Sequence, residues 1–423
     1  MANSAGSHAL WSAQAHMPSV LQRRVEIVGG DGAYVTTSTG ERLLDATAGL
    51  WHANVGHGRE ELAQAAYDQI SRLETYHVFG RFANDAALRL ADRVAGYAPF
   101  ADARVIFGSG GSDAVDTACK LARRHWQLEG KPSKKVILSR EYAYHGLHAF
   151  GTSIAGLEPN REGYGSDSLV PETARIDSVD IGKVAMTIDR LGASNIAAIL
   201  AEPVIGTGGV IPPPPGYLEG LQRLAAENEI LLIADEVITG FGRTGAMFAC
   251  ERFGLRPDML LMAKGITSGY APLGGILVAP RIWERFFSGQ QAPVFRHGLT
   301  YSGHAMACAV AEANLDILSR EDLVSRAAGL EGVLDQALGQ ARSHDLVQEV
   351  RQLGFLAGVE LAAAVDADAV ADIALERGVI LRILRGNTVQ ISPPFVIDEA
   401  EIATIVAALL DSAEEAVAHQ RAS

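Results

Sequence analysis

Two apolar runs of the sequence end on side chains of opposite charge. The run 259–263 stops at Lys264, and the run 230–234 stops at Asp235. A buried ammonium either finds a partner or loses its proton, and a lysine without its proton is a nucleophile. Pyridoxal phosphate needs this combination, because a lysine forms its Schiff base and an acid faces its pyridine nitrogen. In the alternative, Lys264 turns to solvent at the strand end and Asp235 caps a helix or lies in a loop.

A glycine-rich turn supplies a candidate phosphate site. In GSGGSDAVDTACK (108–120), Gly110 and Gly111 leave backbone amides open and Ser112 offers a hydroxyl at the start of a helix. A dinucleotide fingerprint would need a third glycine where Asp113 stands, and a P-loop would need Gly-Lys-Ser/Thr. A plain helix capped by a serine or an aspartate is the other alternative. Beside the charged pair, the turn favours the phosphate of pyridoxal phosphate.

Two loop segments carry further groups that could contact this cofactor. In YAYHG (142–146), Tyr144 or His145 could stack on a flat pyridine ring, or could pack in an ordinary loop. In HGLTYSGH (297–304), Thr300 could donate a hydrogen bond to a phosphate, or could belong to a turn. Both segments are therefore candidates for cofactor contacts.

The elements that must position these groups alternate between strands and helices. Short apolar runs predict strands at 103–110, 134–140, 195–204, 229–237, 258–265 and 274–280. Amphipathic stretches predict helices at 113–126 and 216–229. This alternation is typical of a mostly parallel sheet with helices on both faces, and ligands bind such sheets at the carboxyl ends of the strands. Lys264 and Asp235 follow two of those ends.

The two ends of the chain have a different pattern. Residues 26–49 predict a small hairpin with TSTGE as its turn, and the C-terminal part predicts helix, strand (354–361), helix, strand and helix. We therefore expect residues 1–50 and 311–423 to form a smaller α+β domain. Residues 51–310 would form the large domain.

Composition limits the classes of partner. The chain has 423 residues and a formal charge of −14, which makes nucleic acid and acidic membranes poor partners. Neither a signal peptide at the start nor an apolar run of about 18 residues is recognisable. Three cysteines without a CxxC pair fit a reducing cytoplasm: Cys119, Cys250 and Cys308. Two histidine pairs lack a third ligand at a usual spacing, so we predict no metal site: His52/His57 and His145/His148.

From about residue 25 to 410 the chain resembles the class III (subgroup II) pyridoxal-phosphate aminotransferases of fold type I, in particular the ω-amino acid or amine:pyruvate transaminases. The most specific motifs are IADEVITGFGRTG (233–245) and AKGITSGYAPLGG (263–275). GGSDAVDTACKLAR, AYHG, AEPVIGTGG, HGLTYSGH and ISPPF agree with them. The resemblance implies a large domain with a mostly parallel seven-stranded sheet between helices, and a smaller α+β domain formed by both chain ends.

The resemblance also implies roles for the charged pair and its neighbours. Lys264 would be the Schiff-base lysine and the proton shuttle, and Asp235 would pair with the pyridinium nitrogen. Val237 would pack on one face of the ring, and Tyr144 would stack on the other, with His145 beside it.

The resemblance also implies that two chains hold the phosphate together. Gly111 and Ser112 would contact it from one subunit, and Thr300 would reach it from the neighbouring subunit of a homodimer, which could assemble further into a tetramer. Glu202, in the family's Glu-Pro position, would lie near the cofactor.

Substrate recognition is implied for a third group of residues. Trp51, with Phe79, would line the substrate pocket. Relatives that use 2-oxoglutarate usually carry a glutamate that neutralises the carboxylate-binding arginine, and Thr207 stands in its place here, which favours the pyruvate branch. Arg382 and Arg385 are the candidates for that arginine, and Arg382 is preferred because it directly follows an apolar run.

We therefore expect a transaminase that moves an amino group from an ω-amino acid or a primary amine to pyruvate or a similar 2-oxo acid. The alternatives within the same fold are an aminomutase, a racemase, a decarboxylase and a 2-oxoglutarate-dependent aminotransferase.

Overall fold

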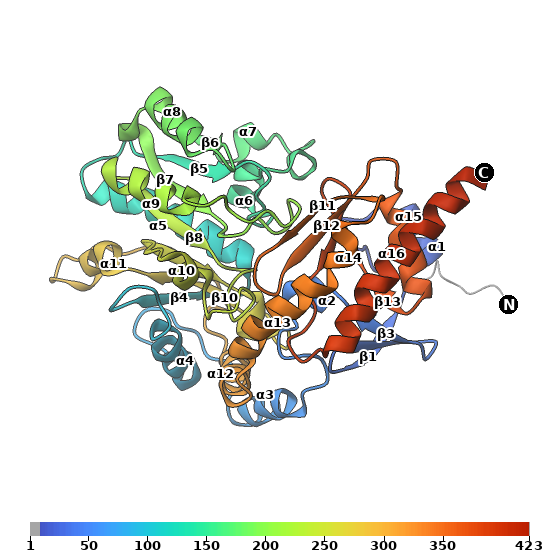
Figure 1. Cartoon of the computed structure of the whole chain (residues 1–423). Helices are drawn as coiled ribbons and strands as arrows, with labels where there is room; N and C mark the ends of the chain where they lie inside the picture. Colours follow the sequence, from blue (N-terminus) through green and yellow to red (C-terminus); the bar gives the residue numbers. More distant parts are fainter. Residues whose placement is uncertain (1–8, 423) are drawn as a thin grey trace.

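The computed structural model of the chain describes residues 9–422, apart from the side chains of residues 166 and 167. A seven-stranded sheet forms its centre (Figure 1). The strand order is β4 (Arg104–Gly108), β10 (Gly274–Val278), β9 (Met259–Met262), β8 (Leu231–Asp235), β7 (Ile196–Ala201), β5 (Val136–Arg140) and β6 (Thr173–Ile176). Strand β10 runs antiparallel to β4 and β9, and the other neighbours are parallel. The predicted fold class is confirmed.

The central strands β7, β8 and β9 are apolar except for Asp235 at the end of β8, because both faces of the sheet are covered. In β8, Ile233 packs in the core that contains residues of α5 (Gly111–Leu128). The next residue toward the N-terminus, Leu232, packs in the core of the other face with residues of α9 (Tyr217–Glu227). The remaining short elements of this region are α6 (Ala149–Ile154), η1 (Glu158–Asn160), α7 (Ser166–Leu169), α8 (Ile181–Leu191), η2 (Ala193–Asn195), α10 (Ala249–Phe253) and α11 (Pro280–Phe287).

Three longer helices pack together below the sheet in Figure 1. They are α3 (Glu60–Arg72), α4 (Asp85–Ala95) and α12 (Ala305–Arg320), and α12 contacts both of the others. Helix α4 begins where the Asn84 side chain accepts a hydrogen bond from the Ala87 amide, as N-caps commonly do. Helix α12 leads the chain away from the large sheet.

Two smaller sheets lie outside the large one, and strands from both ends of the chain meet in the first of them. Strands β1 (Ile27–Asp31), β2 (Tyr34–Thr37) and β3 (Arg42–Asp45) form hairpins, and β13 (Val379–Ile380) from the C-terminal part pairs with β3. The second sheet has the order β11 (Val347–Gln352), β12 (Ala357–Leu361), β15 (Thr388–Ile391) and β14 (Arg382–Leu384). The helices here are α1 (Met17–Arg23), α13 (Leu323–Ala337), α14 (Gly339–Arg342), α15 (Ala367–Glu376) and α16 (Glu399–Ala422). The predicted domain limits at residues 50 and 310 stay predictions.

The loop after β3 is folded back by one buried carboxylate. The Asp45 side chain accepts hydrogen bonds from the amides of Thr47 and Gly49, and its Oδ2 atom lies 2.9 Å from His57 Nε2. The loop contains the single turn α2 (Ala48–Trp51), in which Ala48 and Trp51 have φ angles of 48° and 61°. Residues with a side chain rarely adopt this left-handed backbone conformation. The hydrogen bonds to Asp45 therefore help to hold the loop in this shape.

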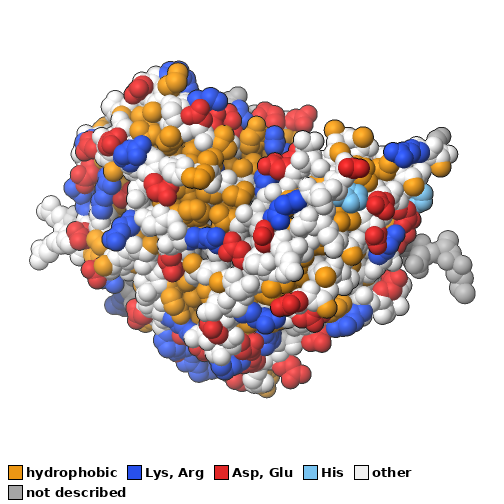
Figure 2. Space-filling view, in the orientation of Figure 1, with side chains coloured by type: hydrophobic (Ala, Val, Ile, Leu, Met, Phe, Trp, Pro, Cys, Tyr) orange, Lys and Arg blue, Asp and Glu red, His pale blue; other side chains and the backbone are white. Residues whose placement is uncertain are grey.

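The surface carries mixed charge. On the face shown in Figure 2, basic and acidic side chains are interspersed, and apolar side chains gather toward the centre. Within residues 9–422, no helix combines the length and the apolarity that crossing a membrane requires.

Candidate active site

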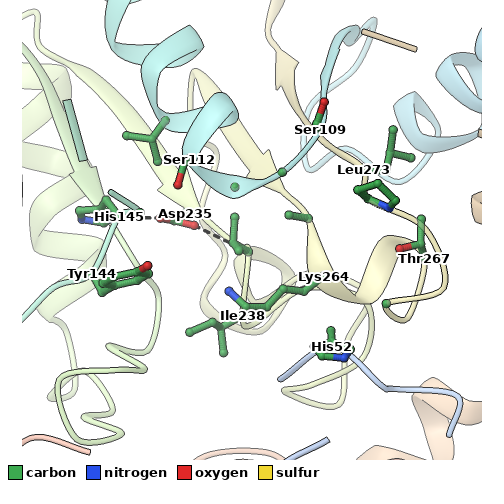
Figure 3. Close-up of a pocket in the computed structure, with 18 of the residues that line it drawn as sticks. His52, Ser109, Ser112, Tyr144, His145, Asp235, Ile238, Lys264, Thr267 and Leu273 are labelled. Atoms are coloured by element: carbon green, nitrogen blue, oxygen red, sulfur yellow. Dashed lines mark hydrogen bonds and ion pairs between the residues drawn. The ribbon is translucent and has the colours of Figure 1, made fainter. Parts of the chain in front are cut away.

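A cavity of about 480 Å³ opens at the carboxyl ends of β8 and β9 (Figure 3). Its walls come from the turn between β4 and α5, the loop after β5, the end of β7 and the segment 267–273. Most of the site residues predicted from the sequence line it: Gly111, Ser112, Tyr144, His145, Glu202, Asp235, Val237 and Lys264. The structure therefore brings together side chains from strands that are far apart in the sequence.

Lys264 follows β9 and begins the short turn η3 (Lys264–Ile266) with a φ of 49°. This left-handed conformation is costly for a residue with a side chain, and such strain occurs preferentially at functional sites. Burial, together with the charge of Arg382, lowers the pKa of Lys264 to about 8 against the opposing effect of Asp235 and Glu202. A substantial fraction of the amine is therefore unprotonated at mildly alkaline pH and can act as a nucleophile.

Asp235 is held in place by a histidine. Its Oδ2 atom lies 2.8 Å from His145 Nδ1, and its Oδ1 atom accepts a hydrogen bond of 3.1 Å from the Val237 amide. Both side chains of the Asp235–His145 pair are almost completely buried, and His145 Nε2 has no hydrogen-bond partner among residues 9–422. The sequence offered His145 as a stacking residue, and the structure shows it as the partner of the carboxylate.

The N-terminus of α5 lies at one end of the cavity. Gly110 precedes the helix without a side-chain cap, so the amides of the first turn have no side-chain partner. The Asp113 carboxylate accepts a hydrogen bond of 2.7 Å from the Ser109 amide and thereby closes the turn. A β-carbon at Gly111 would lie 3.1 Å from Val237 Cγ1, so the glycine allows the helix to approach the cavity wall. Open amides and a helix dipole suit a phosphate.

Glu202 joins two loops of the cavity wall. Its Oε1 atom accepts a hydrogen bond of 3.0 Å from the Tyr144 amide, and its Oε2 atom accepts one of 2.9 Å from the Gly206 amide. Burial raises the pKa of this carboxyl group. The two bonds fix the backbone of Tyr144, whose half-buried ring lines the cavity (Figure 3).

Four predicted residues lie outside the cavity lining of the single chain: Trp51, Phe79, Thr300 and Arg382. Trp51 is buried beneath Arg382, whose guanidinium carbon lies 4.6 Å from the centre of the indole ring. Phe79 is 46% exposed and lines a separate groove with Gly298, and Thr300 is exposed. The charge of Arg382 nevertheless acts on Lys264, whereas the Arg385 guanidinium lies over Tyr142, 3.7 Å from its ring centre.

Other lining residues were not predicted: His52, Ser109, Ile238, Thr267 and Leu273. Ile238 directly follows Val237 and Ser109 directly precedes the two glycines, so adjacency to the motifs could have indicated both. His52 belongs to the folded-back loop after β3. Its position depends on left-handed residues that the sequence does not reveal.

The groups around the cavity match those of pyridoxal phosphate one by one. Lys264 offers an amine for an aldehyde, and Asp235 offers a carboxylate for a pyridine nitrogen. The start of α5 offers amides and the Ser112 hydroxyl for a phosphate, and Tyr144 offers an aromatic ring. The residues present therefore fit this cofactor.

Comparison with known proteins agrees with this geometry. The family model for class III aminotransferases matches residues 16–412. The chain is 36% identical over 418 residues to an omega-aminotransferase of Caulobacter vibrioides, covering 92% of this chain and 94% of the relative. It is 37% identical over 409 residues to a putrescine–pyruvate aminotransferase of Pseudomonas aeruginosa, covering 90% and 88%. A solved amine transaminase from an uncultivated Pseudomonas species, in its pyridoxal-phosphate-bound form, matches with a TM-score of 0.89 and 36% identity over 97% of this chain and 98% of that one. The chain therefore belongs to the class III aminotransferases, which are pyridoxal-phosphate-dependent enzymes.

Proposed function

We propose that this aminotransferase transfers an amino group from an ω-amino acid or a primary amine to pyruvate or a similar 2-oxo acid. The observation that supports a 2-oxo acid as the acceptor is that Arg382 has no acidic side chain to pair with in the described part of the chain. Its half-buried guanidinium makes no ion pair within residues 9–422, and its hydrogen bond to Gln390 Oε1 is long, at 3.5 Å. Position 207 carries a threonine, which cannot neutralise the guanidinium. An unpaired arginine near Lys264 is suited to bind the carboxylate of a 2-oxo acid.

The residues of the chain divide the chemistry between them. When bound, pyridoxal phosphate supplies an electron sink for the carbanion that forms when the donor loses a proton. Lys264 Nζ would hold the cofactor and then carry that proton. Asp235, held by His145, would keep a negative charge beside the ring nitrogen. The start of α5 would bind the phosphate, and Val237 and Tyr144 would pack against the ring.

A half-reaction experiment tests the reaction class. Purified enzyme would be mixed with a panel of amine donors, with and without pyruvate, and both the donor and the acceptor would be quantified. A transaminase consumes the two in equal amounts, whereas an aminomutase, a racemase or a decarboxylase converts its substrate without an acceptor. Repeating the assay with 2-oxoglutarate separates the two acceptor classes, and faster turnover with 2-oxoglutarate would contradict the proposed branch.

Arg382→Ala is expected to raise the Michaelis constant for pyruvate far more than that for a simple aliphatic or benzylic amine. The guanidinium would bind the carboxylate of pyruvate and swing aside when the hydrophobic donor enters. Losing the charged hydrogen bonds should cost roughly 2–3 kcal/mol, or about thirty- to two-hundred-fold in apparent affinity for pyruvate. Steady-state kinetics with each substrate varied in turn measures this difference.

Arg385→Ala is the matched control for this variant. Its guanidinium lies over the ring of Tyr142 and does not line the cavity, so the variant should have nearly normal kinetics. If the two variants exchanged behaviour, Arg385 would be the carboxylate-binding residue. If neither changed the constant for pyruvate, the role of an arginine in this region would be refuted.

We also propose that the active enzyme is a homodimer with shared sites. Exposed aromatic side chains gather around the groove that Phe79 lines, including Phe82 at 47% exposed, and Tyr301 beside Thr300 is 61% exposed. Large contiguous apolar patches are rare on monomeric proteins, so a cluster of exposed aromatic side chains is a candidate interface. A second copy of the chain could cover them and bring its Thr300 to the phosphate end of the cavity. Two-fold symmetry would then give two equivalent sites.

Mixing two impaired variants tests this arrangement. Thr300→Asp should weaken phosphate binding by repulsion, and Lys264→Ala should be inactive. If Thr300 acts across the interface, a mixed dimer contains one intact site, and activity should return to roughly a quarter of the wild-type level after random reassortment of subunits. No recovery, with subunit exchange verified by tagged chains, would show that Thr300 acts within its own chain or not at all.

A further inference from the structure

His52 lines the cavity but has no part in the cofactor contacts described above. Its imidazole lies in a slot between two glycines. A β-carbon at Gly49 would lie 2.5 Å from the ring atom Cε1, and one at Gly269 would overlap Cδ2. Both glycines also have positive φ angles, at 62° and 84°. The slot therefore fits the flat ring closely and fixes its position. Figure 3 shows His52 at the edge of the cavity near Lys264.

The hydrogen bonds of the ring fix its tautomer. The Leu50 amide donates to His52 Nδ1 at 3.2 Å, so in the neutral ring the proton is on Nε2. Burial lowers the pKa of His52, the charges of His57, Lys264 and Arg243 lower it further, and the charge of Asp45 opposes them. The neutral ring is therefore favoured near pH 7. Among residues 9–422, Nε2 has no hydrogen-bond partner.

The charges around the cavity determine which group of an amine donor can bind to the Nε2–H of His52. Glu202 and Asp235 are the carboxylates that line the described cavity, and both accept hydrogen bonds from their own neighbours. The guanidinium of the nearby Arg382 is cationic. A second ammonium on a donor would thus meet a cation and an N–H donor, without an acidic side chain free to pair with it. An oxygen atom on the donor would find the N–H of His52.

We propose, on the basis of the transaminase function above, that His52 determines donor specificity by donating its Nε2–H to an oxygen atom at the distal end of the amine donor. Donors with a distal carboxylate or hydroxyl group are therefore preferred to diamines. The acceptor half of the reaction does not need this contact, because pyruvate is bound through Arg382.

A matched set of donors tests the proposal on the holoenzyme. The set is 4-aminobutanoate, 4-amino-1-butanol, 1,4-diaminobutane and pentylamine, which have similar lengths and different ends. In His52→Phe, which keeps a flat ring but has no N–H, kcat/KM should fall roughly ten- to a hundredfold for 4-aminobutanoate, less for the alcohol, and little for pentylamine. His52→Gln, whose side-chain amide places an N–H near the position of Nε2, should recover part of the loss.

Two results would overturn the proposal. An equal loss for all four donors in His52→Phe would show that the ring only fills its slot. A wild-type enzyme that prefers 1,4-diaminobutane to 4-aminobutanoate would show that the cavity selects a cation.

A binding experiment separates this inference from the proposed function. Butanoate carries the distal oxygen atoms but no amino group, so its binding to the holoenzyme can be followed by calorimetry without turnover. His52→Phe should weaken butanoate binding roughly tenfold or more and leave butylammonium binding unchanged. If no donor is consumed with any acceptor, the transaminase proposal fails, whatever the binding shows. If donors are consumed but butanoate binds both proteins equally, the role of His52 fails.

Discussion

Lys264→Ala is expected to lower transamination by roughly four orders of magnitude or more, because one side chain supplies both the covalent anchor and the proton carrier. The variant should still fold, since Lys264 donates no hydrogen bond to a neighbour that would be left unpaired in the described structure. It should also still hold pyridoxal phosphate without a covalent bond, through the start of α5 and Asp235. Single-turnover kinetics with donor and a spectrum of the bound cofactor measure both properties.

Lys134 makes the test of Lys264 more stringent. Burial lowers the pKa of Lys134 to about 8 as well, so a depressed pKa alone does not identify the reactive amine. Lys134 Nζ donates to the backbone carbonyls of Ala193 and Glu229, at 2.8 and 2.9 Å, and does not line the cavity. Borohydride reduction followed by peptide mapping should label Lys264 and leave Lys134 unlabelled. A label on Lys134, or on the exposed Lys120, would refute the assignment.

Asp235→Asn should slow the proton-transfer step by roughly two to four orders of magnitude. An asparagine can still accept the hydrogen bond from His145, but it has no negative charge to keep the ring nitrogen protonated. Cofactor binding should weaken too, because a hydrogen bond to a charged group contributes roughly 1.5–3 kcal/mol. Stopped-flow measurement of the half-reaction and titration of the apoenzyme with cofactor test these two effects separately.

His145→Gln is the control for the role of charge. This variant retains the carboxylate of Asp235 and can still donate a hydrogen bond, so its proton transfer should slow much less than in Asp235→Asn. Wild-type-like turnover of Asp235→Asn would remove Asp235 from the mechanism. If proton transfer slowed equally in Asp235→Asn and His145→Gln, the position of the Asp235 side chain, and not its charge, would be what matters for the reaction.

The sequence predicted those parts of the fold that depend on local pattern. Continuous apolar runs marked β7, β8, β9 and β10 because strands buried on both faces must be apolar at every position. The edge strand β6 was not predicted, because its four residues are mostly half-exposed or exposed and form no apolar run. Lys264 and Asp235 were predictable as neighbours because parallel strands end at the same edge of a sheet.

Long-range packing was not predictable in the same way. The pairing of His145 with Asp235 depends on how the loop after β5 folds across the strand ends, and no spacing in the sequence encodes it. The stacking of Arg382 over Trp51 joins the two ends of the chain. The left-handed conformations of Lys264 and Trp51 are also invisible to propensity, since only glycine adopts them readily.

The antiparallel strand β10 affects how the protein can be synthesised. Gly274 pairs with Gly108 and Gly275 pairs with Met262, so β10 joins the strand before the turn at residues 109–110 to the strand that leads to Lys264. A nascent chain therefore cannot bind the cofactor until the ribosome has released β10. Before that moment the strands β4 and β9 each lack the neighbour that β10 provides, and unpaired strand edges favour aggregation or the recruitment of chaperones. The cofactor can thus stabilise only the finished fold and cannot guide the earlier steps of its assembly.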